Sequence, residues 1–149
     1  MKIIFLGQNG ILIESKKSTF VIDPYLSNSV EKIDSRNKRK QPIDKSFLSI
    51  KPDVVVITHS HADHYDEETL DKLLEDNVGA VLLVPPSVFF RAKKRYSRCN
   101  CVYFRSGTSF SAEDAVFTAV KAEHSDPAAI GAIISCEGKN LYFTGDTLY

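Results

Sequence analysis

Three of the chain's four histidines lie within six positions, in the segment His59–His64 with the sequence HSHADH. This segment directly follows Asp53–Thr58 (DVVVIT), a continuous β-branched run that is typical of a strand covered on both faces. Open α/β sheets place their chemistry just beyond strand ends. In an extended loop His59 and His61 point to the same side, so their two imidazoles can hold one ion. The pattern therefore predicts a metal site at one edge of a buried sheet.

Asp63 and His64 extend the cluster with a carboxylate and a third imidazole, which suit a second ion nearby. The alternative is a polar loop whose histidines are simply solvated, which is the ordinary explanation for a lone histidine. Three imidazoles and one aspartate at this spacing favour the metal site over the solvated loop.

The composition is that of one soluble globular domain over residues 1–149, with 43% apolar and 26% charged residues. Lysine plus arginine equals aspartate plus glutamate, 19 against 19, so no overall field attracts nucleic acid or a membrane surface. The apolar opening Met1–Leu6 is too short for a signal sequence, and no stretch is long enough to span a membrane. Three cysteines without a disulfide pattern fit a reducing cytoplasm.

Hydrophobic periodicity predicts strands at both ends of the chain and alternating strands and helices between them, which indicates an α/β (α+β) fold. The expected strands are Lys2–Leu6, Ile11–Glu14, Thr19–Ile22, Asp53–Thr58, Ala80–Val84, Cys101–Phe104, Ala115–Ala122, Ile130–Cys136 and Leu141–Thr144. One helix is expected after Asp66 as N-cap, and another after Pro85-Pro86 with Ser87 as its cap. Ser27 to Lys45 has no clear period and is expected to be a long surface loop.

Two basic runs leave two explanations open. The first contains Arg36, Lys38, Arg39 and Lys40, and the second has five basic residues between Arg91 and Arg98. They either contact a phosphate or polyanion at the rim of the site, or form a solvated surface that also compensates a helix dipole.

The HSHADH segment resembles the His-X-His-X-Asp-His signature of the metallo-β-lactamase superfamily, and the resemblance extends along the whole chain. His124, at the end of a predicted strand, resembles the third ligand of that family's first metal ion. Gly145-Asp146-Thr147 resembles the family's bridging-aspartate motif. Asp23 resembles an early aspartate that orients ligands from outside the coordination shell. Taken singly, His124 could be a strand-end histidine and Asp146 a turn former.

The resemblance implies a ligand set that uses every histidine of the chain. His59, His61 and His124 would hold one ion, Asp63 and His64 a second, and Asp146 would bridge the two. One or two divalent cations are therefore expected, with zinc first and manganese or iron as alternatives.

The implied activity is metal-dependent hydrolysis, in which a metal-activated water attacks a polarised carbonyl or phosphoryl centre. Asp63 and Asp146 are the expected catalytic carboxylates. The segments Asp23–Ser29 (DPYLSNS) and Gly145-Asp146-Thr147 most resemble the L-ascorbate-6-phosphate lactonase branch. This resemblance implies a small-molecule substrate, an ester or lactone such as a phosphorylated sugar lactone. Two alternatives stay open: a phosphodiesterase or nuclease of the same superfamily, and a metal-binding but catalytically inactive fragment or assembly subunit.

The family fold is a four-layer αββα sandwich of two similar halves, and its members are longer than this chain. We therefore expect the N-terminal half plus the first strands of the second half, in a single domain that is incomplete at its C-terminal end. No histidine remains after Asp146 to complete the second ion's shell, so weaker occupancy is expected there. Unpaired strand edges in the hairpin Ile130–Thr144 predict a homo-oligomer or completion by a further segment.

Overall fold

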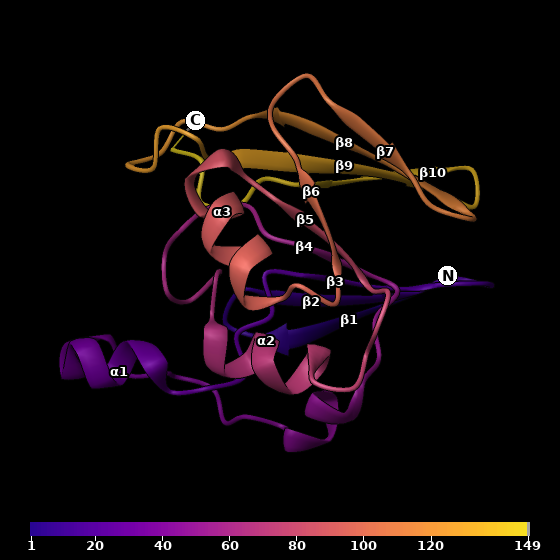
Figure 1. Ribbon diagram of the computed structural model, residues 1–149. Coiled ribbons are helices and arrows are strands. Elements are labelled where there is room, and N and C mark those ends of the chain that lie inside the picture. The colour runs from indigo at the N-terminus through magenta and orange to yellow at the C-terminus, as the bar shows by residue number, and fades with distance from the viewer. Residues whose placement is uncertain (149) are drawn as a thin grey trace.

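The computed structural model describes residues 1–148, which form two stacked β-sheets with helices over one of them (Figure 1). The first sheet has six strands in the order β1 to β6, and the second has four in the order β10-β9-β8-β7. The first sheet comprises β1 (Lys2–Gly7), β2 (Gly10–Glu14), β3 (Thr19–Ile22), β4 (Val54–Val56), β5 (Val81–Val84) and β6 (Asn100–Tyr103). The second comprises β7 (Ser109–Ser111), β8 (Ala115–Lys121), β9 (Ile130–Cys136) and β10 (Lys139–Phe143).

Strands β3 to β6 run parallel, while β1 to β3 and the whole second sheet are antiparallel. The parallel strands β4, β5 and β6 are joined through helices α2 (Glu67–Leu74) and α3 (Pro86–Arg95). Such crossovers bring the carboxyl ends of successive strands to one edge of the sheet. The histidine segment follows β4 at this edge.

The side chains of β4 explain why DVVVIT is apolar without alternation. Val54 and Val56 pack in the core between the two sheets, where Phe117 of β8 is also fully buried. Val55 and Ile57 point the other way, into the core under α2 and α3. Both faces of the strand are therefore covered, as the sequence predicted.

The segment expected to be an irregular surface loop contains short helical pieces. These are α1 (Ser29–Ile33) and a 3₁₀ turn over Ser35–Asn37, followed by another 3₁₀ turn over Lys45–Ser49. Asp34 and Asp44 cap the two 3₁₀ turns by accepting the backbone N–H of Arg36 and of Ser46. All three pieces are too short for hydrophobic periodicity to reveal, and side-chain capping stabilises the two 3₁₀ turns but not α1.

Two further expectations were incomplete or wrong. The edge strand β7 was not predicted, because only three residues form it and the side chains of Ser109 and Ser111 are exposed. Helix α3 begins at Pro86 with Pro85 at its N-cap, so Ser87 is not the cap. The Ser87 hydroxyl instead donates a hydrogen bond to Asp126 Oδ2 (2.7 Å) on a distant loop.

The layer order is helix, sheet, sheet, which is the expected sandwich without its fourth layer within residues 1–148. The expected α/β fold is confirmed in this sense. Among these residues no helix combines the length and apolar character needed to cross a membrane.

Candidate metal centre

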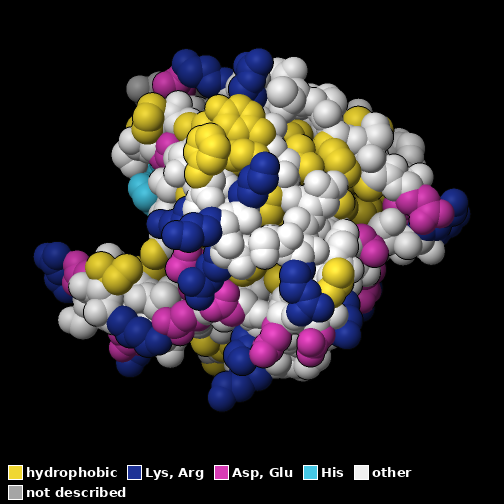
Figure 2. Space-filling view, viewed as in Figure 1, with side chains coloured by type: hydrophobic (Ala, Val, Ile, Leu, Met, Phe, Trp, Pro, Cys, Tyr) yellow, Lys and Arg dark blue, Asp and Glu magenta, His cyan; other side chains and the backbone are white. Residues whose placement is uncertain are grey.

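Five segments far apart in the sequence converge at the edge where β3 and β4 end. Asn9 lies in the turn between β1 and β2, and Asp23 directly follows β3. His59–His64 follows β4, while His124 and Asp146 come after β8 and β10 of the second sheet. A histidine side chain reaches the surface at this end of the molecule in Figure 2. The site therefore lies between the two sheets and draws residues from both.

The first cluster consists of His59, His61 and His124, whose nearest ligand atoms all lie within 4.8 Å of one another. His61 Nδ1 and His124 Nε2 are 3.1 Å apart. Two nitrogens bound to one tetrahedral zinc ion are about 3.3 Å apart, given Zn–N bonds of about 2.0–2.1 Å. The spacing of the imidazoles therefore fits a shared cation.

Hydrogen bonds on the outer side of two rings fix which nitrogen faces this cluster. The Thr58 hydroxyl donates to Asp23 Oδ2 (2.6 Å), so its oxygen accepts from His59 Nδ1 at 3.0 Å. Ser125 Oγ lies 3.2 Å from His61 Nε2, where it can accept a hydrogen bond from the protonated nitrogen of that ring. Each ring is thus left with an unprotonated nitrogen, His59 Nε2 and His61 Nδ1, on its inner side.

His59 Nε2 is the observation that best supports a bound ion. The His59 side chain is 1% exposed, and Nε2 is buried without a hydrogen-bond partner among the described residues. A buried polar nitrogen without a partner costs stability. A divalent cation held by the three imidazoles would satisfy it, so the donor set fits the metal that the signature implies.

The second cluster consists of His59, His64 and Asp146, again with ligand atoms within 4.8 Å of one another. The two carboxylate oxygens of Asp146 divide between the rings: Oδ1 lies 3.3 Å from His64 Nε2, and Oδ2 lies 3.9 Å from His59 Nε2. A carboxylate placed in this way can contact two neighbouring cations. This arrangement suits the bridging role that the resemblance implies for Asp146.

Asp63 lies beside the second cluster but not within it. Its Oδ2 is 4.0 Å from His64 Nε2. The side-chain nitrogen of Asn9 lies between them, 2.9 Å from Asp63 Oδ2 and 3.1 Å from His64 Nε2. All six predicted ligands are thus gathered at one edge, with Asp63 outside both clusters.

Burial and neighbouring charges set different proton affinities for two of the rings. Burial, reinforced by the charge of nearby His64, lowers the pKa of His59 to about 4. Burial also acts to lower the pKa of His64, but the hydrogen bond and charge of Asp23, followed by Asp146, outweigh it and raise that pKa. His59 is therefore neutral near pH 7 and can donate its lone pair, while the field at His64 favours a positive charge.

Asp126 is a supporting residue that the sequence did not reveal. Its Oδ2 accepts the backbone N–H of Ser60 (2.9 Å) and the hydroxyl of Ser87, and its Oδ1 accepts the N–H of Ala128 (2.9 Å). Burial acts to raise its pKa, but these hydrogen bonds outweigh burial and lower it to about 2. Asp126 thus ties the loop that carries His124 to the HSHADH segment and to the start of α3.

Asn9, Thr58 and Ser125 were also missed. Each is an ordinary turn, strand-end or loop residue in the sequence, and none has a local signal of its own. Asp23, by contrast, was predicted from the sequence as a ligand-orienting aspartate, and it accepts a hydrogen bond from His64 Nδ1 at 2.8 Å.

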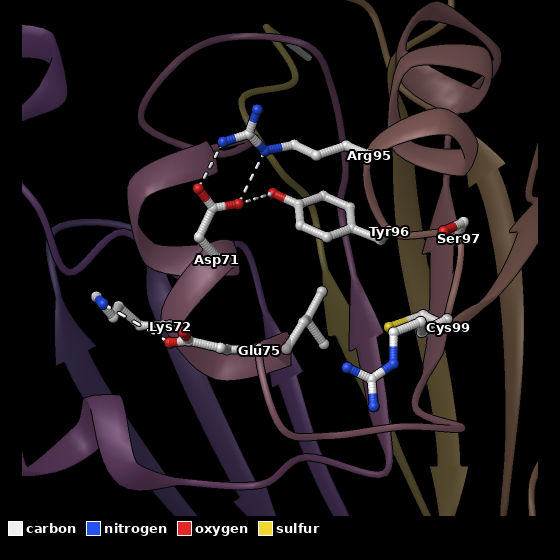
Figure 3. Close-up of a pocket in the computed structure, with 9 residues that line it drawn as sticks. Asp71, Lys72, Glu75, Arg95, Tyr96, Ser97 and Cys99 are labelled. Carbon is white, nitrogen blue, oxygen red and sulfur yellow. Dashed lines mark hydrogen bonds and ion pairs between the residues drawn. The ribbon is translucent and has the colours of Figure 1, made fainter.

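A cavity of about 440 Å³ lies elsewhere, between α2 and the end of α3 (Figure 3). Arg95 makes a two-pronged ion pair with Asp71, and the Tyr96 hydroxyl donates to the same carboxylate. Lys72 and Glu75 pair beside them. Because these groups pair with one another, we interpret the cavity as part of the contact between the two helices rather than as a catalytic site.

The family model for the beta-lactamase superfamily domain matches residues 18–149. A protein named "UPF0173 metal-dependent hydrolase" from Korarchaeum cryptofilum is 29% identical over 150 residues, which cover 99% of this chain and 60% of that protein. The protein of the same name from Oenococcus oeni is 28% identical, with 99% and 64% covered. The chain thus spans less than two thirds of the length of these curated relatives.

Solved structures share the fold. Igni18, a metallo hydrolase from Ignicoccus hospitalis, superposes with a TM-score of 0.68 at 22% identity, covering 97% of this chain and 60% of Igni18. CmlA, a diiron β-hydroxylase from Streptomyces venezuelae, has a TM-score of 0.75 at 19% identity, covering 97% of this chain and 29% of CmlA. Because the family model matches most of the sequence and the fold gathers the signature histidines at one site, this chain belongs to the metallo-β-lactamase superfamily.

Proposed function

We propose that this chain carries the metal-binding part of a metal-dependent hydrolase. The convergence of three imidazoles on a buried, unpartnered His59 Nε2 is the observation that carries this proposal. The names of the curated relatives, "metal-dependent hydrolase", support it. Zinc is the proposed ion for the first cluster, because an all-imidazole donor set suits it. Manganese and iron are the alternatives.

A divalent cation bound here supplies Lewis acidity and an activated water. The protein's own groups have separate tasks. His59 and His61 are held in fixed orientations by Thr58 and Ser125, so they present lone pairs without reorganisation. We assign to Asp63 the orientation of the attacking water, because Asn9 fixes its carboxylate beside the clusters. We assign to Asp146 the bridging role.

We propose an ester or lactone as the substrate class, with a phosphorylated sugar lactone as the leading candidate. Exposed Lys38 and Lys40 line a hollow of about 230 Å³ together with buried Arg39. Arg39 packs against Gly7, at the base of the turn that brings Asn9 to the site. These cations favour an anionic group on the substrate.

The test compares metal content and turnover in the chain stripped by chelator and reloaded with zinc or manganese. We expect at least one tightly bound ion and hydrolysis of a lactone. His61→Ala should abolish turnover and weaken ion binding by more than tenfold, since it removes one of three imidazoles. Turnover of a chromogenic phosphodiester but not of lactones would assign the chain to the phosphodiesterase alternative. Bound metal without turnover of either substrate, unchanged by His61→Ala, would make it an inactive metal-binding protein.

We further propose that β10 pairs with another strand, from a second copy or from a further segment. It is one of the two edge strands of its sheet within the described residues, and its Tyr142 side chain is 54% exposed. Exposed edges of this kind promote association. Light scattering should show a dimer or larger species for the 149-residue chain, and a cooperative monomer would contradict self-pairing. A cytoplasmic location stays a prediction.

A further inference from the structure

We propose that Asn9 is a ligand of the second metal position and makes that position rich in oxygen donors. In this proposal its carboxamide joins Asp63 and His64 around a harder divalent cation such as Mn²⁺, next to the imidazole cluster. The inference rests on the proposed function, because it presupposes that the first cluster binds a metal ion.

The distances among the three side chains match those within a coordination shell. The Asn9 terminal nitrogen lies 2.9 Å from Asp63 Oδ2 and 3.1 Å from His64 Nε2, and these two atoms are 4.0 Å apart. A point equidistant from the three atoms lies about 2 Å from each, close to the metal–ligand bond lengths of about 2.0–2.2 Å for imidazole and carboxylate. The end of the Asn9 side chain thus lies at the distance from this point that a metal ligand would have.

The hydrogen-bond count around Asn9 also favours a cation. Its amide nitrogen has two hydrogens, yet three acceptors face it: the Asp63 backbone oxygen at 3.2 Å, Asp63 Oδ2 and His64 Nε2. In the neutral His64 ring, Nδ1 donates to Asp23, so Nε2 is an acceptor. With His64 neutral, one of the three acceptors is left without a hydrogen from Asn9, and a metal ion at this point would accept the lone pairs that remain.

Asn9 lies in a tight turn with a strained backbone. Gly7 pairs with Gly10 across a two-residue connection, and β1 has a register irregularity between Phe5 and Gly7. Gln8 has φ of 52°, a left-handed conformation that a residue other than glycine rarely adopts. Such strain is concentrated at functional sites, where the surroundings maintain it. In this turn the Asn9 side chain contacts Asp63, which lies 54 residues later in the sequence.

An asparagine carboxamide can supply either a donor or an acceptor from nearly the same place. Rotation by half a turn about its last bond exchanges the oxygen and nitrogen. With the oxygen facing the ion, the position has oxygen donors from Asn9 and Asp63 and one imidazole from His64. Oxygen donors favour manganese and magnesium, whereas imidazoles favour zinc. The two positions would therefore differ in metal preference.

The experiment titrates Mn²⁺ into the 149-residue chain preloaded with one equivalent of Zn²⁺, with free Mn²⁺ followed by electron paramagnetic resonance. Wild type is compared with Asn9→Ala, Asn9→Asp and, as a matched control on the same turn, Gln8→Ala. Far-ultraviolet circular dichroism and thermal unfolding verify the fold of each. We expect Asn9→Ala to weaken Mn²⁺ binding at least tenfold, Asn9→Asp to retain or strengthen it, and Gln8→Ala to leave it within twofold.

Three results would overturn the proposal. If Asn9→Ala leaves Mn²⁺ binding unchanged or tightens it, Asn9 is not a ligand. If Asn9→Asp is as weak as Asn9→Ala, Asn9 acts only as a hydrogen-bond donor to Asp63. If wild type holds no Zn²⁺ in the preloading step, the proposed function fails together with this inference. Zinc retention with no effect at Asn9 overturns this inference alone.

Discussion

At the scale of single residues, Asp23 is the carboxylate on which the orientation of the ligands depends most. It accepts from His64 Nδ1 and from both the N–H and the hydroxyl of Thr58, and Thr58 in turn contacts His59. Its φ of 45° is a left-handed conformation held by these contacts. Asp23 therefore helps to orient His59 in the first cluster and His64 in the second cluster.

Asp23→Asn should weaken metal binding by about 10- to 100-fold, because an amide cannot accept all of these hydrogen bonds. Isothermal titration with Zn²⁺ measures the change. Asp53→Asn is the control: Asp53 also accepts a backbone N–H, from Thr19 at 2.7 Å, but precedes β4 and lies at the opposite end of the strand from the site. Equal losses in both variants would mean that Asp23 acts only on general stability.

Asp126 should make the free energy of unfolding depend on pH in the acid range. Its folded pKa of about 2 lies below the ordinary value of 3.8, so its ionised form stabilises the folded chain above that ordinary value, and the contribution is lost as the pH falls toward 2. Asp126→Asn should cost about 1–2 kcal/mol at pH 7. Urea unfolding at several pH values tests this. The gap between wild type and variant should narrow below pH 4, and a gap independent of pH would contradict the explanation.

At the scale of elements, the connection after β10 depends on a glycine. Gly145 has φ of +57°, and a Cβ there would meet Thr58 Cβ and Oγ1 at 3.0 Å. This close approach brings Asp146 of the second sheet against the loop that follows β4 in the first sheet. A larger residue must push the two apart.

Gly145→Ala should therefore destabilise the fold by about 1 kcal/mol or more and also weaken metal binding, since Asp146 moves with it. Gly138→Ala separates the two effects. Gly138 also has positive φ, +71°, but nothing lies within 4 Å of its Cβ position. The Gly138→Ala variant should lose a similar free energy of unfolding but keep the metal affinity of the wild type. Equal metal affinity in both variants would show that the contact with Thr58 does not position Asp146.

Among the elements, those with a repeating apolar pattern were predicted well. Strand β3 was predicted with its observed bounds, Thr19–Ile22, as was β9 at Ile130–Cys136, and α2 begins after Asp66 as expected. The Asp66 side chain makes no capping bond and instead accepts from the Thr69 hydroxyl. Helix α1 was not predicted because its five residues span less than two turns of a helix, and β7 because its three residues span less than two repeats of the strand pattern.

At the scale of the whole molecule, contact between the two sheets holds the ligands of the first sheet, in His59–His64, close to those of the second sheet, His124 and Asp146. Phe117 of β8 is fully buried there and packs edge-on against Phe20 of β3, with ring centres 5.1 Å apart. Phe117→Ala should cost about 3–5 kcal/mol in the free energy of unfolding. Val116→Ala, on the opposite face and 40% exposed, should cost under about 1 kcal/mol. Guanidinium titration of both variants tests this, and similar losses would contradict a core between the sheets.

The sequence by itself determined the candidate ligands and the fold class. Both are recorded locally, in the density of histidines after a β-branched run and in the periodicity of the strands. Only the tertiary structure decided which nitrogen of each ring faces inward, and that Asn9 rather than a further histidine adjoins Asp63 and His64. Those facts depend on partners such as Ser125 and Asp126, more than 60 positions from the histidine loop they contact. Because such contacts arise only when two sheets pack, no local pattern in the chain encodes them.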